Sequence, residues 1–125
     1  MISVLKKIFG GTKHDKDVQS LKPLVLQINE EYSRLSTLTD EQLRSKTHEF
    51  KALIQSRTAT LQEELLGLRE QLTSNDMDHA ESLSIHDRIK DIGSEEFEII
   101  QDTLDEILPE AFAVVKETCR RLTER

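Results

Sequence analysis

Apolar residues recur at intervals of three and four along most of this chain, and few residues interrupt the pattern. Only four Gly and two Pro occur among its 125 residues. Intervals of three or four place side chains on one face of an α-helix, whereas a strand needs strict alternation. The pattern therefore predicts an all-α fold, with a long antiparallel, coiled-coil-like helical hairpin and shorter flanking helices.

The hairpin is predicted from two apolar stripes on either side of a polar turn. The first arm runs from about Thr39 to Thr73 and opens with the capping-box pattern Thr39-Asp40-Glu41-Gln42. Residues 74–78 have the composition of a turn. Stripes of this spacing, joined by a short turn, pack against each other. They consist of Phe50, Ile54, Leu61, Leu65, Leu68 and Leu72 on the first arm, and of Ile85, Ile89, Ile92, Phe97, Ile100, Leu104 and Ile107 on the second.

Breaks are expected on both sides of the hairpin. Gly10-Gly11 should end an N-terminal helix. Pro23 should kink or restart a helix that runs from about residue 15 to residue 35.

Breaks are also expected in the C-terminal half. Gly93-Ser94 is a candidate break in the second arm, with Ser94 capping a new helix. Pro109 should stand in the first turn of a last helix over residues 110–125. Cys119 lies on the apolar face of that helix, so we expect a small buried core residue there.

Charge is unevenly distributed along the chain, whose net charge is −7. Residues 61–110 contain fifteen acids and three bases, a net of −12, whereas residues 1–22 contain five Lys and two Asp, a net of +3. An acidic middle repels phosphate backbones, so nucleic acid is not an expected partner.

Catalytic and metal chemistry find no support in the residue pattern. His79 and His86 are seven positions apart and straddle the expected turn, which does not suit a helical metal pair. Adjacent carboxylates such as Glu63-Glu64 point to different helix faces, so they make no acid–base pair. We expect no catalytic residue, no metal site and no bound cofactor in this chain.

The cellular compartment follows from what the sequence lacks. A single cysteine rules out an intrachain disulfide and suits a reducing compartment. No apolar run reaches the roughly 20 residues that span a bilayer, and the N-terminus lacks the features of a secretory signal. We expect a cytoplasmic protein.

The N-terminal end combines an apolar helix face with lysines. This pattern favours contact with an anionic membrane surface or a protein partner. The alternative is a short helix that docks on its own domain or frays. The candidate contact residues are Ile2, Leu5, Lys6, Lys7, Ile8, Phe9, Lys13 and Lys16.

Two stretches resemble SecA, the family of bacterial ATPases that drive preproteins through the SecY channel. Residues 38–50, LTDEQLRSKTHEF, are similar to the family's L-[ST]-D-E-[EQ]-L-x-x-K-T-x-E-F segment. Residues 108–117, LPEAFAVVKE, are similar to its L-P-E-A-F-A-V-V-[RK]-E segment. The Ile8-Phe9-Gly10 sequence also resembles the family's opening helix.

The resemblance implies a domain plan and a place in a larger machine. Residues 1–12 would be an amphipathic N-terminal helix and 13–57 a helical part of the first nucleotide-binding domain. In the commoner family pattern a short linker separates the two segments, but here 57 residues lie between Phe50 and Leu108. Residues 58–107 therefore resemble an inserted acidic hairpin, and 108–125 a helix that returns to the nucleotide-binding domain.

The resemblance also implies partners. These are the SecY channel, the preprotein and anionic lipid, at the inner face of the bacterial plasma membrane. The parent would bind ATP and Mg²⁺ in a G-x-x-x-x-G-K-[ST] loop, and that pattern does not occur in these 125 residues. We therefore expect an inactive piece of a longer motor. The competing interpretation is a stand-alone helical interaction module, and exposed seams in either case would allow self-association.

Overall fold

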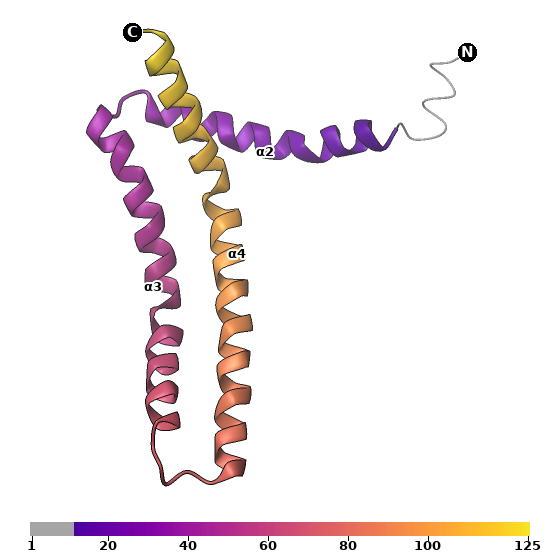
Figure 1. The fold of residues 1–125 in the computed structure, drawn as a ribbon. Coiled ribbons are helices and arrows are strands. Elements are labelled where there is room, and N and C mark those ends of the chain that lie inside the picture. The colour runs from indigo at the N-terminus through magenta and orange to yellow at the C-terminus, as the bar shows by residue number, and fades with distance from the viewer. Residues whose placement is uncertain (1–11) are drawn as a thin grey trace. The chain divides into compact units, whose positions relative to one another are not determined.

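The fold is all-α, as the spacing of apolar residues predicts. The structure, a computed structural model, describes residues 12–125, and 89% of these lie in three helices with no strand among them. The helices are α2 (Lys13–Leu35), α3 (Asp40–Leu72) and α4 (His79–Thr123) (Figure 1).

The described residues divide into two compact units. The first unit contains residues 12–39 and Pro109–Arg125, and so combines α2 with the C-terminal part of α4. The second unit contains Asp40–Leu108, and so combines α3 with the remainder of α4. Buried residues occur in both: Leu35, Ala113 and Glu117 in the first, and Leu43, Thr58, Ile92 and Thr103 in the second.

Helix α2 begins at a reciprocal cap. The Thr12 hydroxyl accepts a hydrogen bond from the Asp15 N–H, and the Asp15 carboxylate accepts one from the Thr12 N–H at 3.0 Å. This arrangement satisfies two of the free donors at a helix start. The predicted restart at Pro23 is wrong, since α2 continues through that residue. A helix can do so by giving up one backbone hydrogen bond when the flanking turns are intact.

The second unit pairs its two helices in antiparallel order. Arg57 near the middle of α3 contacts Glu106, whereas Glu64, further along α3, contacts Arg88, which lies earlier on α4. The partner on α4 therefore moves backward as α3 moves forward, and the two helices run side by side (Figure 1). Residues 73–78 join them, where the sequence predicts a turn.

Helix α4 is one helix where the sequence predicts breaks. Neither Gly93-Ser94 nor Pro109 ends it, and the helix runs unbroken from His79 to Thr123. A glycine inside a helix costs only about 1 kcal/mol, which neighbouring packing can offset. Pro109 instead marks the border between the two units.

The unbroken helix shifts the row of α4 that faces α3. Ile92 and Thr103 are buried, and Glu96 and Ile99 between them are half-buried. Phe97, predicted on this seam together with Leu104, is instead 63% exposed, and Leu104 is 40% exposed. A break at residue 93 would have let the following helix start again with a different set of side chains facing α3. Without it, residues 97 and 104 lie about 100° around the helix from the seam.

Part of the contact between α3 and α4 is made by polar side chains. The Thr103 hydroxyl donates to the Ile99 carbonyl at 2.7 Å and accepts from the Arg57 guanidinium at 3.2 Å. Glu96 accepts a hydrogen bond from Gln62. Among residues 12–125, no buried side-chain nitrogen or oxygen lacks a hydrogen-bond partner. The seam is therefore polar in part, and its polar groups pair across the two helices.

Candidate functional site

The predicted membrane or partner contact is described only in part. Ile2, Leu5, Lys6, Lys7, Ile8 and Phe9 lie outside the described residues. Lys13 is the first residue of α2 and Lys16 lies one turn later, and both are exposed. Their contact with lipid or with a partner stays a prediction.

An exposed apolar stripe lies further along α2. Val18, Leu21 and Val25 follow the three-and-four spacing of one helix face, and Leu26 lies beside them. All four are exposed, and together with Lys22 they line an open apolar hollow. This part of α2 therefore presents an exposed apolar surface that contains Lys22, whereas Lys13 and Lys16 fall roughly on the opposite side of the helix.

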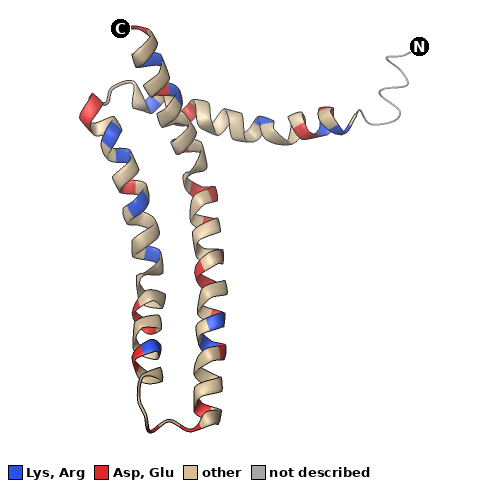
Figure 2. Cartoon of the chain, in the orientation of Figure 1, with Lys and Arg blue, Asp and Glu red and all other residues tan. Residues whose placement is uncertain are grey.

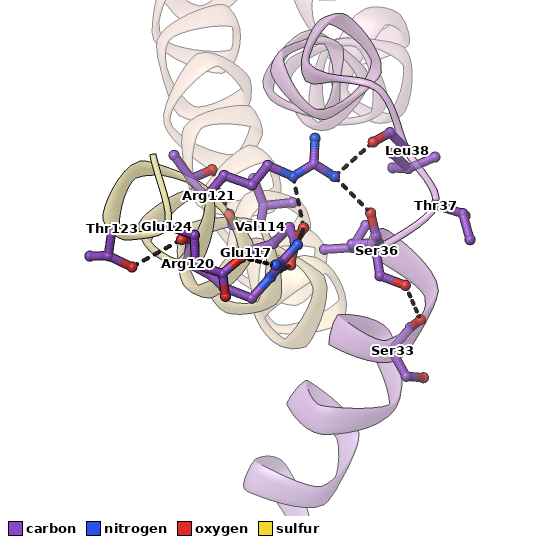
Figure 3. Close-up of polar contacts among 12 residues, drawn as sticks. Ser33, Ser36, Thr37, Leu38, Val114, Glu117, Arg120, Arg121, Thr123 and Glu124 are labelled. Atoms are coloured by element: carbon purple, nitrogen blue, oxygen red, sulfur yellow. Dashed lines mark hydrogen bonds and ion pairs between the residues drawn. The ribbon is translucent and has the colours of Figure 1, made fainter.

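The C-terminal part of α4 meets the end of α2 through a buried carboxylate. Glu117 has no exposed surface, and its two oxygens accept hydrogen bonds from both arginines that follow it. Arg120 donates from Nη2 at 2.7 Å and from Nε at 3.0 Å, and Arg121 donates from Nε at 2.7 Å. Figure 3 shows the three side chains converging. One buried acid thus holds two guanidinium groups in place.

The electrostatics of this cluster follow from its hydrogen bonds. The bond from Arg120 lowers the pKa of the Glu117 carboxyl to about 2, with burial opposing the change and the bond from Arg121 adding to it. The same pairing raises the pKa of Arg120 above its ordinary value. Glu117 is therefore ionised at neutral pH although it is buried.

Arg121 extends the cluster to the end of α2. Its Nη2 donates to the Leu38 carbonyl at 2.7 Å (Figure 3). It also donates to the Leu35 carbonyl at 3.3 Å. Leu35 is the last residue of α2, where helix carbonyls have no partner within the helix and a cation is favoured. Glu117 orients the arginine, and the arginine caps the helix.

A second contact joins the same two helices. The Lys116 ammonium lies 4.2 Å from the centre of the Tyr32 ring and donates to the Asn29 side-chain oxygen at 3.0 Å. The contact adds a cation–π interaction one helical turn before the cap. Together the two contacts hold α2 against residues 109–123 of α4 within the first unit.

The opposite face of this part of α4 is apolar and exposed. Phe112, Val115 and Leu122 are all more than half exposed. Cys119 lies among them and is exposed, so the prediction of a buried core cysteine is wrong. The reason is that the helix turns Ala113 and Glu117 toward α2, and residue 119 falls on the other side.

The described part of the chain shows no metal cluster and no membrane span. Across residues 12–125, His, Cys, Asp and Glu side chains form no group of three or more that could hold a metal ion. None of the three helices has the length and apolar character needed to cross a bilayer.

Sequence reasoning missed the Glu117 cluster. Its signal is the spacing E-x-x-R-R, which puts Arg120 and Arg121 at three and four residues from the acid on one helix face. That spacing is common on solvated helices. Only the position of the Leu35 and Leu38 carbonyls gives it a role here.

The fold and these faces define a class: a helical protein that pairs its helices internally and leaves several apolar side chains exposed. Comparison with known protein families shows which family the chain belongs to. The model of the SecA DEAD-like domain family matches residues 5–125, so this chain belongs to the SecA family. The resemblance noted from the two short segments is confirmed.

Similar proteins are named as protein translocase subunits. The protein translocase subunits SecA of Chloroherpeton thalassium and Prosthecochloris aestuarii are both 39% identical over 122 residues, and that of Chlorobaculum tepidum is 36% identical. Each match covers 98% of this chain but 12% of the relative. No solved structure matches the chain.

The extent of these matches bears on the acidic hairpin. A match over 98% of the chain spans residues 58–107. The matched stretch therefore includes the segment that resembles an inserted hairpin, and the insertion itself stays a prediction.

Proposed function

We propose that this chain is the N-terminal helical part of a motor that uses ATP to drive preproteins through the SecY channel. The observation that carries the proposal is the family match over residues 5–125, together with relatives that are named as translocase subunits. The chain spans only 12% of those relatives, so the motor activity belongs to the whole protein in this proposal.

The ATP and Mg²⁺ of such a motor would bind outside residues 1–125. Phosphate is normally held by the backbone N–H groups of a glycine-rich loop and by a lysine. The chain's four glycines do not form that pattern. Titration of the chain with Mg-ATP in a calorimeter should give no saturable heat, and a saturable signal would contradict this part of the proposal.

Residues 13–57 and 108–125 would belong to the first nucleotide-binding domain of the motor. The support is the exposed apolar face of Phe112, Val115 and Leu122, which leaves water when it packs on a larger domain. Cys119 on that face offers a test. A maleimide should label Cys119 readily in the 125-residue chain and slowly in the whole motor, as read from peptide mass spectra. Equal labelling rates would argue against packing on this face.

The basic, apolar N-terminal end would contact anionic lipid at the inner face of the plasma membrane. The support is an exposed apolar stripe on one side of α2 with Lys22 in it, and the exposed Lys13 and Lys16 on the polar side of the same helix. Vesicles rich in phosphatidylglycerol should bind the chain better than neutral vesicles, and removal of residues 1–10 should abolish the difference.

A paired substitution separates local contact from overall charge. Lys13→Gln with Lys16→Gln should weaken binding to the anionic vesicles. Lys51→Gln with Lys90→Gln changes the net charge equally at two exposed lysines of the other unit and should not. Equal effects of the two pairs would contradict a specific lipid contact.

The second candidate function is a stand-alone helical interaction module. It is favoured by the same open apolar faces, which need a partner whether or not a motor is attached. The reading frame after Arg125 discriminates between the two. An in-frame G-x-x-x-x-G-K-[ST] motif supports the motor, and a stop codon supports the module.

A further inference from the structure

Helix α4 carries a second apolar row that α3 does not cover. The covered row includes Ile92, Ile99 and Thr103. The second row is displaced by one residue, to Phe97 and Leu104, and both side chains are exposed. Within the hairpin unit, α4 therefore has one apolar face in use and one without a partner.

Charged residues are sorted around the same stretch of helix. At about 100° per residue, six of the seven acids between residues 91 and 106 fall within an arc of roughly 100°, and Glu96 lies outside it. The arc that contains Phe97 and Leu104 spans roughly 140°, and none of its residues from Lys90 to Leu108 is acidic. Most residues of this arc are apolar, as is typical of a helix face that packs against something, and the polar residues in it are Lys90, Ser94 and Gln101. The six acids are Asp91, Glu95, Glu98, Asp102, Asp105 and Glu106.

Two acids without an ion pair lie at one border of this face. Glu98 and Asp105 lie next to the acid-free arc, and within the described residues neither of them forms an ion pair. Figure 2 shows acidic residues spaced along this part of α4. A basic group placed beside the face would find unpaired carboxylates.

Gly93 leaves an opening in the same face. A side-chain carbon added there would meet no atom within 4 Å. An exposed glycine lets another backbone approach a helix closely. The face thus combines apolar side chains at Phe97 and Leu104, a position without a side chain at Gly93, and a negative border.

We propose that this acid-free face of α4, centred on Phe97 and Leu104, docks an α-helix of a different polypeptide. That helix would be apolar along one stripe and would carry Lys or Arg along the flank that meets Glu98 and Asp105. Helices recognised in this way bury an apolar stripe, and complementary charges at the border fix the partner. The acids disfavour an anionic membrane, and they repel the same border of a second copy.

A designed peptide of about 18 residues serves as the probe. Its leucines follow one helical stripe, its flanks are lysines, and it carries a fluorescent label for anisotropy measurements on the complete chain. The double variant Phe97→Ser, Leu104→Ser should weaken binding at least about tenfold, because two exposed apolar anchors are lost. Leu66→Ser is the matched control, since Leu66 on α3 is 61% exposed, and it should change binding less than about twofold.

Two charge-reversal variants test the role of the negative border. Glu98→Lys and Asp102→Lys change the net charge of −7 equally, but only residue 98 borders the acid-free face. Glu98→Lys should weaken binding by about threefold or more relative to Asp102→Lys, because repulsion acts locally. Circular dichroism should show unchanged helix content in every variant.

Several results would overturn the proposal. Equal losses with the serine double variant and with Leu66→Ser would mean that the peptide does not use this face. Equal effects of Glu98→Lys and Asp102→Lys would mean that overall charge alone attracts it. If the serine double variant instead abolishes self-association in sedimentation, or binding to neutral vesicles, while leaving peptide binding intact, the occupant is a second copy or lipid.

Discussion

The sharpest prediction concerns the buried carboxylate of Glu117. Glu117→Gln keeps the size of the side chain but removes the charge that holds Arg120 and Arg121. A fall of the Glu117 pKa from 4.5 to about 2 corresponds to roughly 3 kcal/mol of interaction with the ionised form. Because Arg120 stays 37% exposed, solvent screening reduces this value, and we expect the first unit to lose about 2–3 kcal/mol.

The assay follows urea unfolding of the first unit through a single intrinsic fluorophore. The chain contains one Tyr and no Trp, and Tyr32 lies on α2 under the Lys116 ammonium. Its emission therefore reports on the contact between α2 and residues 109–123 of α4. Glu124→Gln is the matched control, because Glu124 also pairs with Arg120 but is exposed, and it should cost less than about 0.5 kcal/mol.

The pH dependence supplies an independent check. The pKa of Glu117 is lowered by folding, so its stabilising contribution is complete above about pH 4.5 and disappears as the pH falls toward 2. The wild-type chain and Glu117→Gln should therefore differ at pH 7 and converge near pH 2. A loss in Glu117→Gln no larger than that in Glu124→Gln, or a difference independent of pH, would refute the reasoning.

Three further predictions concern other parts of the chain. Gly93→Ala should raise the unfolding free energy by about 1 kcal/mol in urea titrations followed by circular dichroism. Alanine is the better helix former, and its methyl group would meet no atom within 4 Å. An unchanged or lower unfolding free energy would contradict an open helix surface at residue 93. Cys119 should react to completion with a thiol reagent in the native chain without prior unfolding, and a requirement for urea would show that it is buried. Arg57→Ala should lower the urea midpoint at low salt, where Arg57 pairs with Glu106, and by less in about 1 M salt, because salt screens an exposed pair. Arg69→Ala, an exposed arginine of the same helix, should show no such salt dependence.

Local patterns identify the helices but not all of their ends. The three-and-four spacing is a property of single segments, so the all-α fold follows from it directly. Interruptions such as Gly93 and Pro109 are harder to interpret, because each costs a helix only about 1–3 kcal/mol. Whether the helix ends there depends on the packing of residues on both sides, which the spacing does not give.

The amino-acid sequence alone determined the helix content, the acidic middle and, through two short segments, the family. The phase of α4 was decided by tertiary structure, because an unbroken helix carries the seam from Ile92 on to Thr103 and turns Phe97 outward. Tertiary structure also gave Glu117 its role. Its effect depends on the carbonyls of Leu35 and Leu38. They lie 86 and 83 residues from Arg121 in the sequence and reach it only when the chain is folded.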